Sequence, residues 1–522
     1  MGGQGGMTGS GGGMGSGGSS SGRPSGTGGR TAAGGSPGES EASSSGGTGG
    51  PAAGDGATVG SGGAGGDGVD SVRNGSGAIG GTTAAGGMGR ADGGAGIPGS
   101  CITQSSKISA KIATVGVVTW STTLSGLSSA HIDFGLDTSY GMTAPVASPS
   151  GSNNTTLLLG MKQRKTYHYR IVVSGGGGSC TSDDATLATG SLANRLPTIT
   201  VATSGDKSKL SGGFLVTGQY LGLRGSSAAP AYILDADGEI VWAYDIGMPQ
   251  VTGVKMSYDG THMWINTAGS GSVHRVAMDG STDEDLSKDF TGLSHQLTVE
   301  PDETVAFYSY NDAYGCEDIK EYSPSTGTVK TIVNSSDAEG MTKGSVTCHC
   351  NNVQYSKDDD TLVFSDLFNQ VIVKIKRSDG STVWRLNGPK PTITGVSWVG
   401  GQHGIDLISL SDLLIFNNNS TVVLRPLGGT GDGSIALKVK IDLSGKTASQ
   451  VWAYKASPTI QNDVMGDLQR LPNGNTVVAY STKGVIQEVD SQGNLLSEWE
   501  FPSGTEFGYI EKRMSMYGAP LR

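Results

Sequence analysis

Three absences narrow what this chain can be before any motif is considered. Lys and Arg number 36 against 47 Asp and Glu, a formal net charge of −11, and there is no basic cluster, which disfavours nucleic acid and anionic membranes as partners. No apolar run is long enough to span a bilayer, so no transmembrane segment is expected. The helical spacing of apolar residues is missing from the most regular part of the chain, residues 347–388, which indicates strands.

Residues 1–100 lack the apolar side chains from which a core could form. They hold 41 of the 88 glycines, and Ser, Thr, Ala and Pro fill most of the other positions. Such a composition cannot offset the entropy lost on ordering the chain, so we expect a disordered Gly/Ser-rich tether. Because no three-residue period with proline is present, collagen is excluded.

The first residues, MGGQGGMTGS, have neither the positive segment nor the apolar core of a signal peptide. A long tether ahead of folded β domains is nevertheless typical of bacterial surface proteins. We therefore expect an export signal upstream of Met1, a periplasmic or cell-surface location, and surface anchoring through the tether.

Alternating apolar and polar residues begin at Cys101 and continue to about residue 193. The strand-like runs, separated by short turns, are 115–120, 130–134, 156–159 and 167–173. Their length and spacing suit a small β-sandwich. The phrases GVVTW, HIDFGLDTSYG and LLLGMKQRKTYHYRIVV resemble a fibronectin type III module. This resemblance implies a spacer or docking surface for residues 101–193, to which no chemistry is assigned.

Residues 194–522 repeat one unit of short strands. The unit is clearest at 347–388, and its opening histidine recurs 54 residues earlier and 54 residues later. A closing strand with an aspartate, a glycine turn and an apolar end recurs six times, as in AYILDADGEIVWAY and VIVKIKRSDGSTVW. Sheet repeats of about 40 to 55 residues are typical of β-propellers, so the expected fold is a six-bladed β-propeller.

Histidines at equivalent blade positions should converge in such a fold. The first strand of each blade lies nearest the axis, which places His295, His349 and His403 at one mouth of the central channel. One such histidine is usually a partly exposed polar residue, but three in register predict a shared site. No carboxylate occupies the matching place on these blades, so a metal-dependent lyase or hydrolase is disfavoured, and no metal or other cofactor is predicted.

The five cysteines predict two disulfides, which is consistent with export. Cys101 and Cys180 lie near the two ends of the sandwich and are expected to pair. Cys316 is expected to pair with Cys348 or Cys350, and the sequence leaves both alternatives open. Because side chains alternate along a strand, the last two thiols share one face and the imidazole between them takes the other. One metal bound by all three is therefore disfavoured.

The blade sequences resemble a known family. CHCNNVQYSKDDDTLVFSDLFNQVIVKI, GGQHGIDLISLSDLLIFNNNS and GDLQRLPNGNTVVAYSTKGVIQEVDSQGNLLSEWEF are similar to successive blades of the bacterial arylsulfotransferase family. The opening FLVTGQYLGLRGSSAAPAYILDADGEIVWAY resembles its first blade and GYIEKRMSMYG its C-terminal tail, so the resemblance spans roughly residues 205–522. It implies transfer of a sulfuryl group from an aryl sulfate donor to a phenolic acceptor through sulfohistidine, without a nucleotide sulfate donor.

The resemblance also implies roles for single residues. His403 of GGQHG falls at the family's nucleophile and His349 of CHCNN at the histidine of its His-x-Asn element, with Asn351 as the Asn. His295 matches an earlier channel histidine more loosely. The chemistry fits, because neutral imidazole is a good nucleophile near pH 7. Negative charge that develops on the sulfuryl and phenolate oxygens needs nearby donors, which the other two histidines and Asn351 supply.

One feature of the family is missing. Where it carries an arginine, in the loop after the second strand of the His-x-Asn blade, this sequence has Asp366, Leu367 and Phe368. An aspartate near a sulfate would repel it, so either the loop points away or the anion is bound differently. Arg425, in the long loop of the next blade, could bind the substrate instead, with Lys343 as a weaker candidate; the alternative for Arg425 is a solvated loop residue.

Three aromatic residues in loops expected at the same mouth, Tyr314, Phe368 and Tyr480, could stack on an aryl ring or pack structurally. Two functions stay open from the sequence. The first is an enzyme that uses His403. The second is a catalytically inactive propeller that binds an anionic or aromatic ligand, or a surface partner, at this mouth.

Overall fold

The structure, a computed structural model, describes residues 97–98, 101–192, 196–204, 206–221, 229–269, 271–311 and 315–521. All of them belong to one unit, Ala53–Arg522. The tether expected for residues 1–100 lies outside the described residues, apart from β1 (Ile97–Pro98). Among the described residues the one α-helix is the short α1 (Ser335–Ala338), and the rest of the regular structure is strand or single 3-10 turns, which confirms the all-β fold class.

In the described part of the chain, no helix has both the length and the apolar character needed to cross a membrane.

Two sheets share a core in the N-terminal part of the described chain. One consists of β2 (Ile102–Ile108), β3 (Gly116–Thr122) and β6 (Asn154–Leu158). The other consists of β1, β4 (Leu127–Gly135), β5 (Met142–Pro145), β7 (Thr166–Gly175), β8 (Gly178–Thr181) and β9 (Ala185–Ala188). Alternate residues of β7 are buried and meet Trp120 and Phe134 in this core, as a half-buried strand requires. A disulfide between Cys101 and Cys180 ties the start of β2 to β8.

Six further antiparallel sheets follow in the described part of the chain, each with four or five strands. The first three contain β11 (Phe214–Leu221), β12 (Ala231–Leu234) and β13 (Ile240–Tyr244); β14 (Gly253–Met256), β15 (His262–Thr267), β16 (Ser272–Ala277) and β17 (Asp283–Asp285); and β18 (Leu293–Val299), β19 (Val305–Asn311), β20 (Cys316–Ser323) and β21 (Thr328–Asn334).

The next three sheets contain the rest of the chain. They are β22 (Cys350–Ser356), β23 (Thr361–Asp366), β24 (Val371–Lys376) and β25 (Thr382–Asn387); β26 (Gln402–Ser409), β27 (Asp412–Asn417), β30 (Ile435–Asp442) and β31 (Thr447–Lys455); and β32 (Asp467–Arg470), β33 (Thr476–Tyr480), β34 (Val485–Val489) and β35 (Leu495–Glu500). A small hairpin, β28 (Val422–Val423) and β29 (Arg425–Pro426), lies in the loop between β27 and β30.

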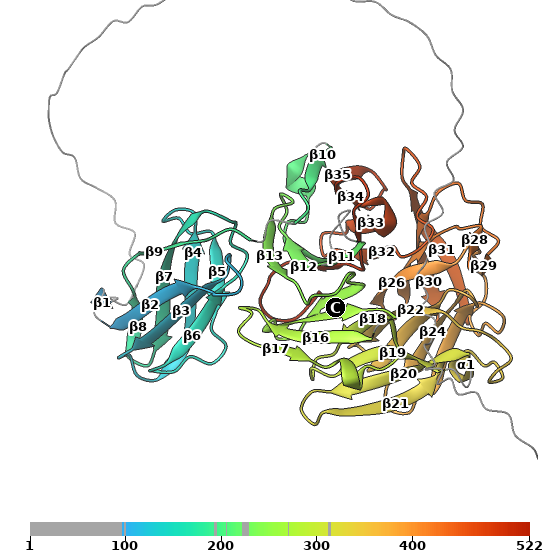
Figure 1. Ribbon diagram of the computed structural model, residues 1–522, viewed down its shortest axis with the longest axis horizontal. Coiled ribbons are helices and arrows are strands. Elements are labelled where there is room, and N and C mark those ends of the chain that lie inside the picture. The colour runs from blue at the N-terminus through green and yellow to red at the C-terminus, as the bar shows by residue number, and fades with distance from the viewer. Residues whose placement is uncertain are drawn as a thin grey trace, which may run out of the picture. The chain divides into compact units, whose positions relative to one another are not determined.

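Strands from the two ends of this segment enter each other's sheets. β10 (Thr200–Thr203), from its start, pairs antiparallel with β35, and the two lie side by side although about 300 residues separate them (Figure 1). From its end, β36 (Glu506–Phe507) and β37 (Glu511–Arg513) both pair with β11. The first and the last sheets are therefore each completed by a strand from the opposite end of the segment.

Hydrogen bonds link each of the six sheets to the next in a closed circuit, through first strands except at Asn266, which lies in β15. Four links join a side chain to a backbone group, and those of Asn352 and Gln354 join two side chains, so these polar groups are satisfied as buried polar groups require. The partners are Asn266 with His295, Asn352 with Gln296, Gln354 with Asp406, Asp406 with Arg470, Gln469 with Lys512, and Glu511 with Met256. The starts of β18, β22 and β26 are consequently neighbours.

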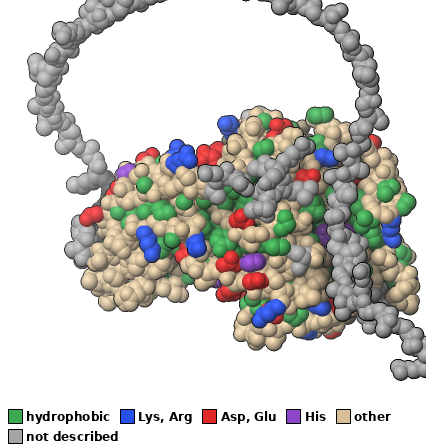
Figure 2. All heavy atoms as spheres, viewed as in Figure 1, with side chains coloured by type: hydrophobic (Ala, Val, Ile, Leu, Met, Phe, Trp, Pro, Cys, Tyr) green, Lys and Arg blue, Asp and Glu red, His purple; other side chains and the backbone are tan. Residues whose placement is uncertain are grey.

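On the face of the molecule shown in Figure 2, lysine and arginine side chains are scattered, and acidic side chains lie among them. This face therefore offers no continuous basic area of the kind that a nucleic acid would need.

Candidate functional site

The three histidines singled out from the sequence lie together at the starts of adjacent strands. His295 is the third residue of β18, His349 directly precedes β22, and His403 is the second residue of β26. The ring centroids of His295 and His349 are 4.7 Å apart with the planes at 81°, and those of His295 and His403 are 6.3 Å apart. Three residues spaced 54 positions apart thus form one cluster of imidazoles.

Each of these strands is irregular at its histidine. The pairing register with the second strand shifts between Ser294 and Leu297, between Cys350 and Asn352, and between Gln402 and Ile405. The other first strands, β14, β32 and β37, pair with their neighbours without such a shift. A β-bulge re-aims a side chain out of the regular alternation and is common beside active sites. Among these six strands, the shifts mark the three that carry a histidine.

His403 is fully buried and held in one tautomer. Its Nδ1 lies 2.7 Å from Oδ1 of Asn418, whose Nδ2 donates to the main-chain carbonyls of Asn462 and Met465 at 2.8 and 2.9 Å. Because the amide nitrogen of Asn418 serves two acceptors, its oxygen accepts, and Nδ1 of His403 carries the proton. The lone pair is then on Nε2, which is buried and has no hydrogen-bond partner.

Burial lowers the pKa of His403 to about 3, the hydrogen bond to Asn418 opposes this shift, and His349 adds to it. The imidazole therefore stays neutral over the ordinary pH range, and its lone pair remains available to attack an electrophile. The sequence reasoning missed Asn418. The available signal was the run of three asparagines, Asn417–Asn419, where β27 ends beside the His403 strand.

His295 has a backbone φ of +52°, which is uncommon for a residue other than glycine and recurs at functional sites. Its Nδ1 lies 2.7 Å from Oγ of Ser294, and its carbonyl accepts a hydrogen bond of 2.6 Å from Nδ2 of Asn266. Burial, together with the two neighbouring imidazoles, holds the pKa of His295 well below its usual value. This ring is therefore also neutral.

His349 is partly exposed, unlike the other two histidines. Its ring stacks on Phe368, with centroids 4.9 Å apart and planes at 26°. The guanidinium carbon of Arg425 lies 4.4 Å from the centroid of the same phenyl ring, and Nη2 of Arg425 donates to the Phe368 carbonyl. Arg425 is thus fixed at the edge of the site, in contact with the ring that touches His349.

The carboxylate of Asp366 is turned toward backbone amides. Its Oδ1 accepts from the N–H groups of His349, Phe368 and Asn369 at 3.1, 2.7 and 3.1 Å. The carbonyl of His349 in turn accepts from the N–H of Leu367 at 2.9 Å. The loop that lacks the family's arginine therefore holds the backbone of His349 on both sides.

Asn351 is fully buried, and its Nδ2 donates to the Gln402 carbonyl at 3.0 Å, next to His403 in the chain. Gln402 is fixed as well, because its Oε1 accepts from Nε1 of Trp398 at 2.9 Å and its Nε2 donates to the Asp366 carbonyl at 2.8 Å. Asn351 thus positions the backbone next to His403, and its contact with a substrate stays a prediction.

The remaining sequence candidates lie elsewhere. Tyr480 is fully buried in a core with Phe416, at a centroid distance of 5.7 Å. Lys343 pairs with Asp337 at 3.1 Å. Tyr314 lies outside the described residues. Of the three aromatic candidates, Phe368 is the one seen at the histidines.

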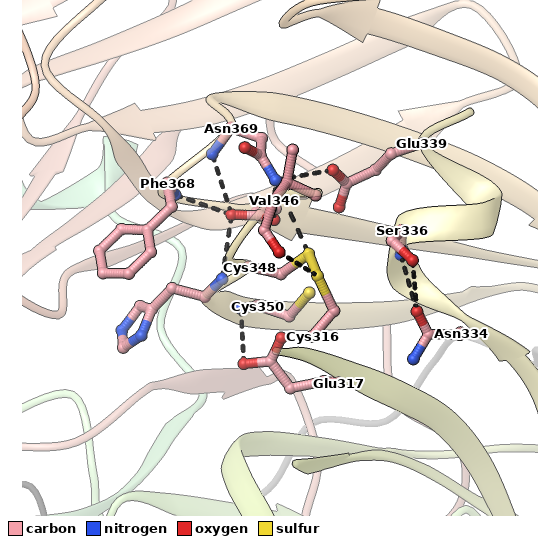
Figure 3. The surroundings of a disulfide bond; sticks show 12 residues. Cys316, Glu317, Asn334, Ser336, Glu339, Val346, Cys348, Cys350, Phe368 and Asn369 are labelled. Carbon is pink, nitrogen blue, oxygen red and sulfur yellow. Dashed lines mark hydrogen bonds between the residues drawn. A yellow bond between two sulfur atoms is a disulfide. The ribbon is translucent and has the colours of Figure 1, made fainter. Parts of the chain in front are cut away.

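A disulfide and several buried acidic groups surround Cys350 (Figure 3). Cys316 is bonded to Cys348, so the structure has the first of the two pairings left open above, and Cys350 is a buried free thiol. Burial and the nearby Asp366 raise the pKa of Glu317 to about 8. Burial and neighbouring carboxylates likewise raise the pKa of Glu339 and of the Cys350 thiol well above their usual values.

Within the described residues, the one group of three metal-ligating side chains whose ligand atoms lie within 4.8 Å of one another is Glu339, Cys350 and Asp366. The three histidines do not form such a group. Further along the same first strands is a cavity of about 90 Å³ whose lining includes Asp406 and Asp467. Its carboxylates make it a poor site for a sulfate ester, which leaves the histidine end of the strands as the candidate site.

Part of the chain that carries this site matches a family model. Residues 323–502 match the family model described as Arylsulfotransferase (ASST). The arylsulfotransferase match covers less than half of the chain; it includes His349 and His403, and His295 precedes it. No curated protein matches the chain.

Three similar solved structures share low sequence identity with this chain. TolB from Acinetobacter baumannii shares 13% identity over 68% of this chain and 80% of its own, with a TM-score of 0.39. Virginiamycin B lyase from Staphylococcus aureus shares 14% over 58% of this chain and 88% of its own, with a TM-score of 0.34. A protein of unknown function from Bacteroides caccae shares 15% sequence identity over 57% of this chain and 98% of its own, with a TM-score of 0.38. At these values the likeness says nothing about function.

Proposed function

We propose that this protein is an aryl-sulfate sulfotransferase that moves a sulfuryl group from a phenolic sulfate ester to a phenol, without a nucleotide sulfate donor and with Nε2 of His403 as the nucleophile. The observation that carries the proposal is the state of this imidazole, which is neutral, oriented by Asn418 and left with an unpaired lone pair beside two further imidazoles. The arylsulfotransferase match over residues 323–502 supports the reaction class.

In the first half-reaction, Nε2 of His403 attacks the sulfur of the ester. An N–S bond forms, the bond between sulfur and the aryl oxygen breaks, and its electron pair leaves with the phenolate, which then takes a proton from a donor or from water. The imidazole gains positive charge in this step, and Asn418 stabilises that charge by accepting the Nδ1 hydrogen bond. His349 is partly exposed, so an aryl sulfate that enters from solvent would contact this imidazole first.

In the second half-reaction, the hydroxyl oxygen of a phenol attacks the sulfur of sulfohistidine. The N–S bond breaks, Nε2 recovers its lone pair, and the phenol proton passes to a base or to water. The aryl sulfate donor and the phenol acceptor therefore use the same site in turn, and the two half-reactions together need no further reactant.

The sulfuryl oxygens carry negative charge that N–H donors must stabilise. We assign this role to His295 and His349, with Asn351 and Arg425 as substrate-binding residues. The contact of Arg425 with Phe368 supports its place at the edge of the site. The competing function is binding of an anionic or aromatic ligand by a catalytically inactive site.

The proposal extends to the architecture. We infer that residues 194–522 form a six-bladed β-propeller, supported by the six sheets and by the circuit of hydrogen bonds that links each sheet to the next. We further infer that residues 101–193 form a fibronectin type III-like sandwich. Two disulfides support export to the periplasm or cell surface, because such bonds rarely persist in the cytosol.

The decisive experiment is detection of the covalent intermediate. Brief exposure of the protein to a chromogenic aryl sulfate, an alkaline quench and intact-mass measurement should reveal one added sulfuryl group in the wild type, and phenol should accelerate aryl release. His403→Ala should show neither. His349→Ala should still form the adduct, more slowly by on the order of 10² to 10³, since it loses one stabilising donor.

His274 provides a matched control, because this histidine lies in β16 and pairs with Asp283 at 2.7 Å, away from the cluster. His274→Ala should react like the wild type. An adduct of undiminished yield in His403→Ala would refute His403 as the nucleophile. No adduct and no aryl release from the wild type, over a range of donors, would establish the binding function instead.

A further inference from the structure

Cys350 is the one cysteine outside a disulfide, and its thiol is buried near several carboxylates (Figure 3). Ligand atoms of Cys350, Glu339 and Asp366 lie within 4.8 Å of one another. A third carboxylate, that of Glu317, accepts a hydrogen bond of 3.1 Å from the Cys350 N–H. All four side chains are exposed by 2% or less. Four groups that can each carry a negative charge therefore share one buried space.

No positive group in the described part of the chain balances this cluster. The carboxylates of Asp366 and Glu339 accept from amides, including Nδ2 of Asn369 at 2.9 Å to each, and neither forms an ion pair within the described residues. Oε1 of Glu339 and Oε2 of Glu317 are buried without any hydrogen-bond partner. Leaving such oxygens unpaired in a protein interior is costly whether the group is charged or neutral. A bound cation would satisfy the unpaired oxygen of Glu339 and the thiol at once.

We propose that Cys350, Glu339 and Asp366 bind a divalent metal ion of the zinc class. Zinc takes thiolate and carboxylate ligands in tetrahedral geometry, about 2.3 Å from sulfur and about 2.1 Å from oxygen, and three protein ligands leave the fourth position to water. A thiol is a poor ligand for calcium or magnesium, which take oxygen ligands. The site lies behind the backbone of His349, because Cys350 is the next residue and Asp366 accepts from the His349 N–H.

The ion would support the candidate active site without touching a substrate. Binding would displace the thiol proton and any carboxyl proton to water. Oδ2 of Asp366 is the oxygen with room for the metal, because it accepts one hydrogen bond, from Asn369 Nδ2, whereas Oδ1 accepts the N–H groups of His349, Phe368 and Asn369. The metal would thus fix the Asp366 carboxylate, and this carboxylate holds the backbone of His349. Groups in contact with active-site residues commonly orient those residues in this way.

The test is metal binding by the full-length, oxidised protein after treatment with a chelator. We expect the wild type to bind one Co²⁺ ion per chain with a thiolate-to-cobalt charge-transfer band, which zinc abolishes by competition. Only Cys350 can give that band while the other four cysteines stay in disulfides. Cys350→Ser should lose the band, and Glu339→Gln should weaken cobalt binding at least about 10-fold.

Asp337→Asn is the matched control, since this carboxylate lies on α1, two residues before Glu339, is 45% exposed and pairs with Lys343. It should bind cobalt like the wild type. Absence of the band in the wild type, or unchanged binding by folded Glu339→Gln, would overturn the proposal. Metal retained by Cys350→Ser but lost by His403→Ala would place the ion at the histidines and overturn it as well. If Cys350→Ser does not fold, Glu339→Gln alone decides.

Discussion

Replacement of Asn418 by leucine should slow the formation of sulfohistidine without abolishing it. In the native site, Oδ1 of Asn418 accepts the proton of His403 Nδ1 at 2.7 Å and so leaves the lone pair on Nε2. Leucine has a similar size but offers no acceptor. The Nδ1–H form of the imidazole would then keep a buried donor without a partner, and the alternative tautomer would place the proton on Nε2, the atom that must attack.

The magnitude follows from the loss of the acceptor as the attacking imidazole becomes positively charged. A hydrogen bond to a charged group is worth about 1.5 to 3 kcal/mol. Since about 1.4 kcal/mol corresponds to a factor of ten, the attack should slow by about 10- to 150-fold. We therefore expect Asn418→Leu to release the aryl group about 10- to 150-fold more slowly in single-turnover experiments, with little change in the donor concentration that gives half-saturation.

Asn419→Leu is the control for this measurement. Asn419 is also buried, at 6% exposure, and its Nδ2 donates to Thr430, Asp432 and the Gly433 carbonyl, but it contacts no histidine. Its replacement should cost stability and leave the single-turnover rate of the folded protein near that of the wild type. A wild-type rate in folded Asn418→Leu, or an equal loss of rate in both variants, would refute the role given to Asn418.

Two further predictions concern stability. The pKa of His403 is about 3 in the folded protein and about 6.5 in the unfolded chain, so between these values the unfolded chain binds more protons and stability falls as pH falls. Between pH 7 and pH 4, the free energy of unfolding measured in urea should fall by about 3 kcal/mol more for the wild type than for His403→Gln. Equal decreases in the two proteins would contradict this prediction. Replacing Cys316 and Cys348 together by serine should cost about 3 kcal/mol at pH 7, because the bridge closes a loop of 32 residues; unchanged unfolding would show that the bond does not form.

The strands and the proximity of the three histidines could be predicted from the sequence, because both follow from repeating features. Alternation with period two predicts strands, and a 54-residue repeat brings residues of equal position to neighbouring strands. The pairing of Cys316 depended on finer geometry. Cys348 and Cys350 share a face by alternation, so the pattern alone could not choose between them, and the position of Cys348 before the regular part of β22 did.

Side-chain direction at the site could not be predicted for the same reason. Register shifts at the starts of β18, β22 and β26 interrupt the alternation on which such a prediction relies. Asp366 thus turns its carboxylate to the amide of His349, and Asn418 becomes the partner of His403. Neither contact has a signature in spacing, because each joins a loop or strand end to a residue in another strand.

The loop that replaces the family's arginine suggests how an anion would be stabilised here. Asp366 is directed to backbone amides and Phe368 packs on His349, so neither brings positive charge to the cluster. His403 and His295 are neutral because burial lowers their pKa values. Hydrogen bonds from neutral N–H groups are weaker than those from a guanidinium, but they strengthen where water is excluded. Under the proposed function, burial of His403 is therefore the feature that lets the site work with imidazoles, and with Arg425 at its edge, in place of an adjacent arginine.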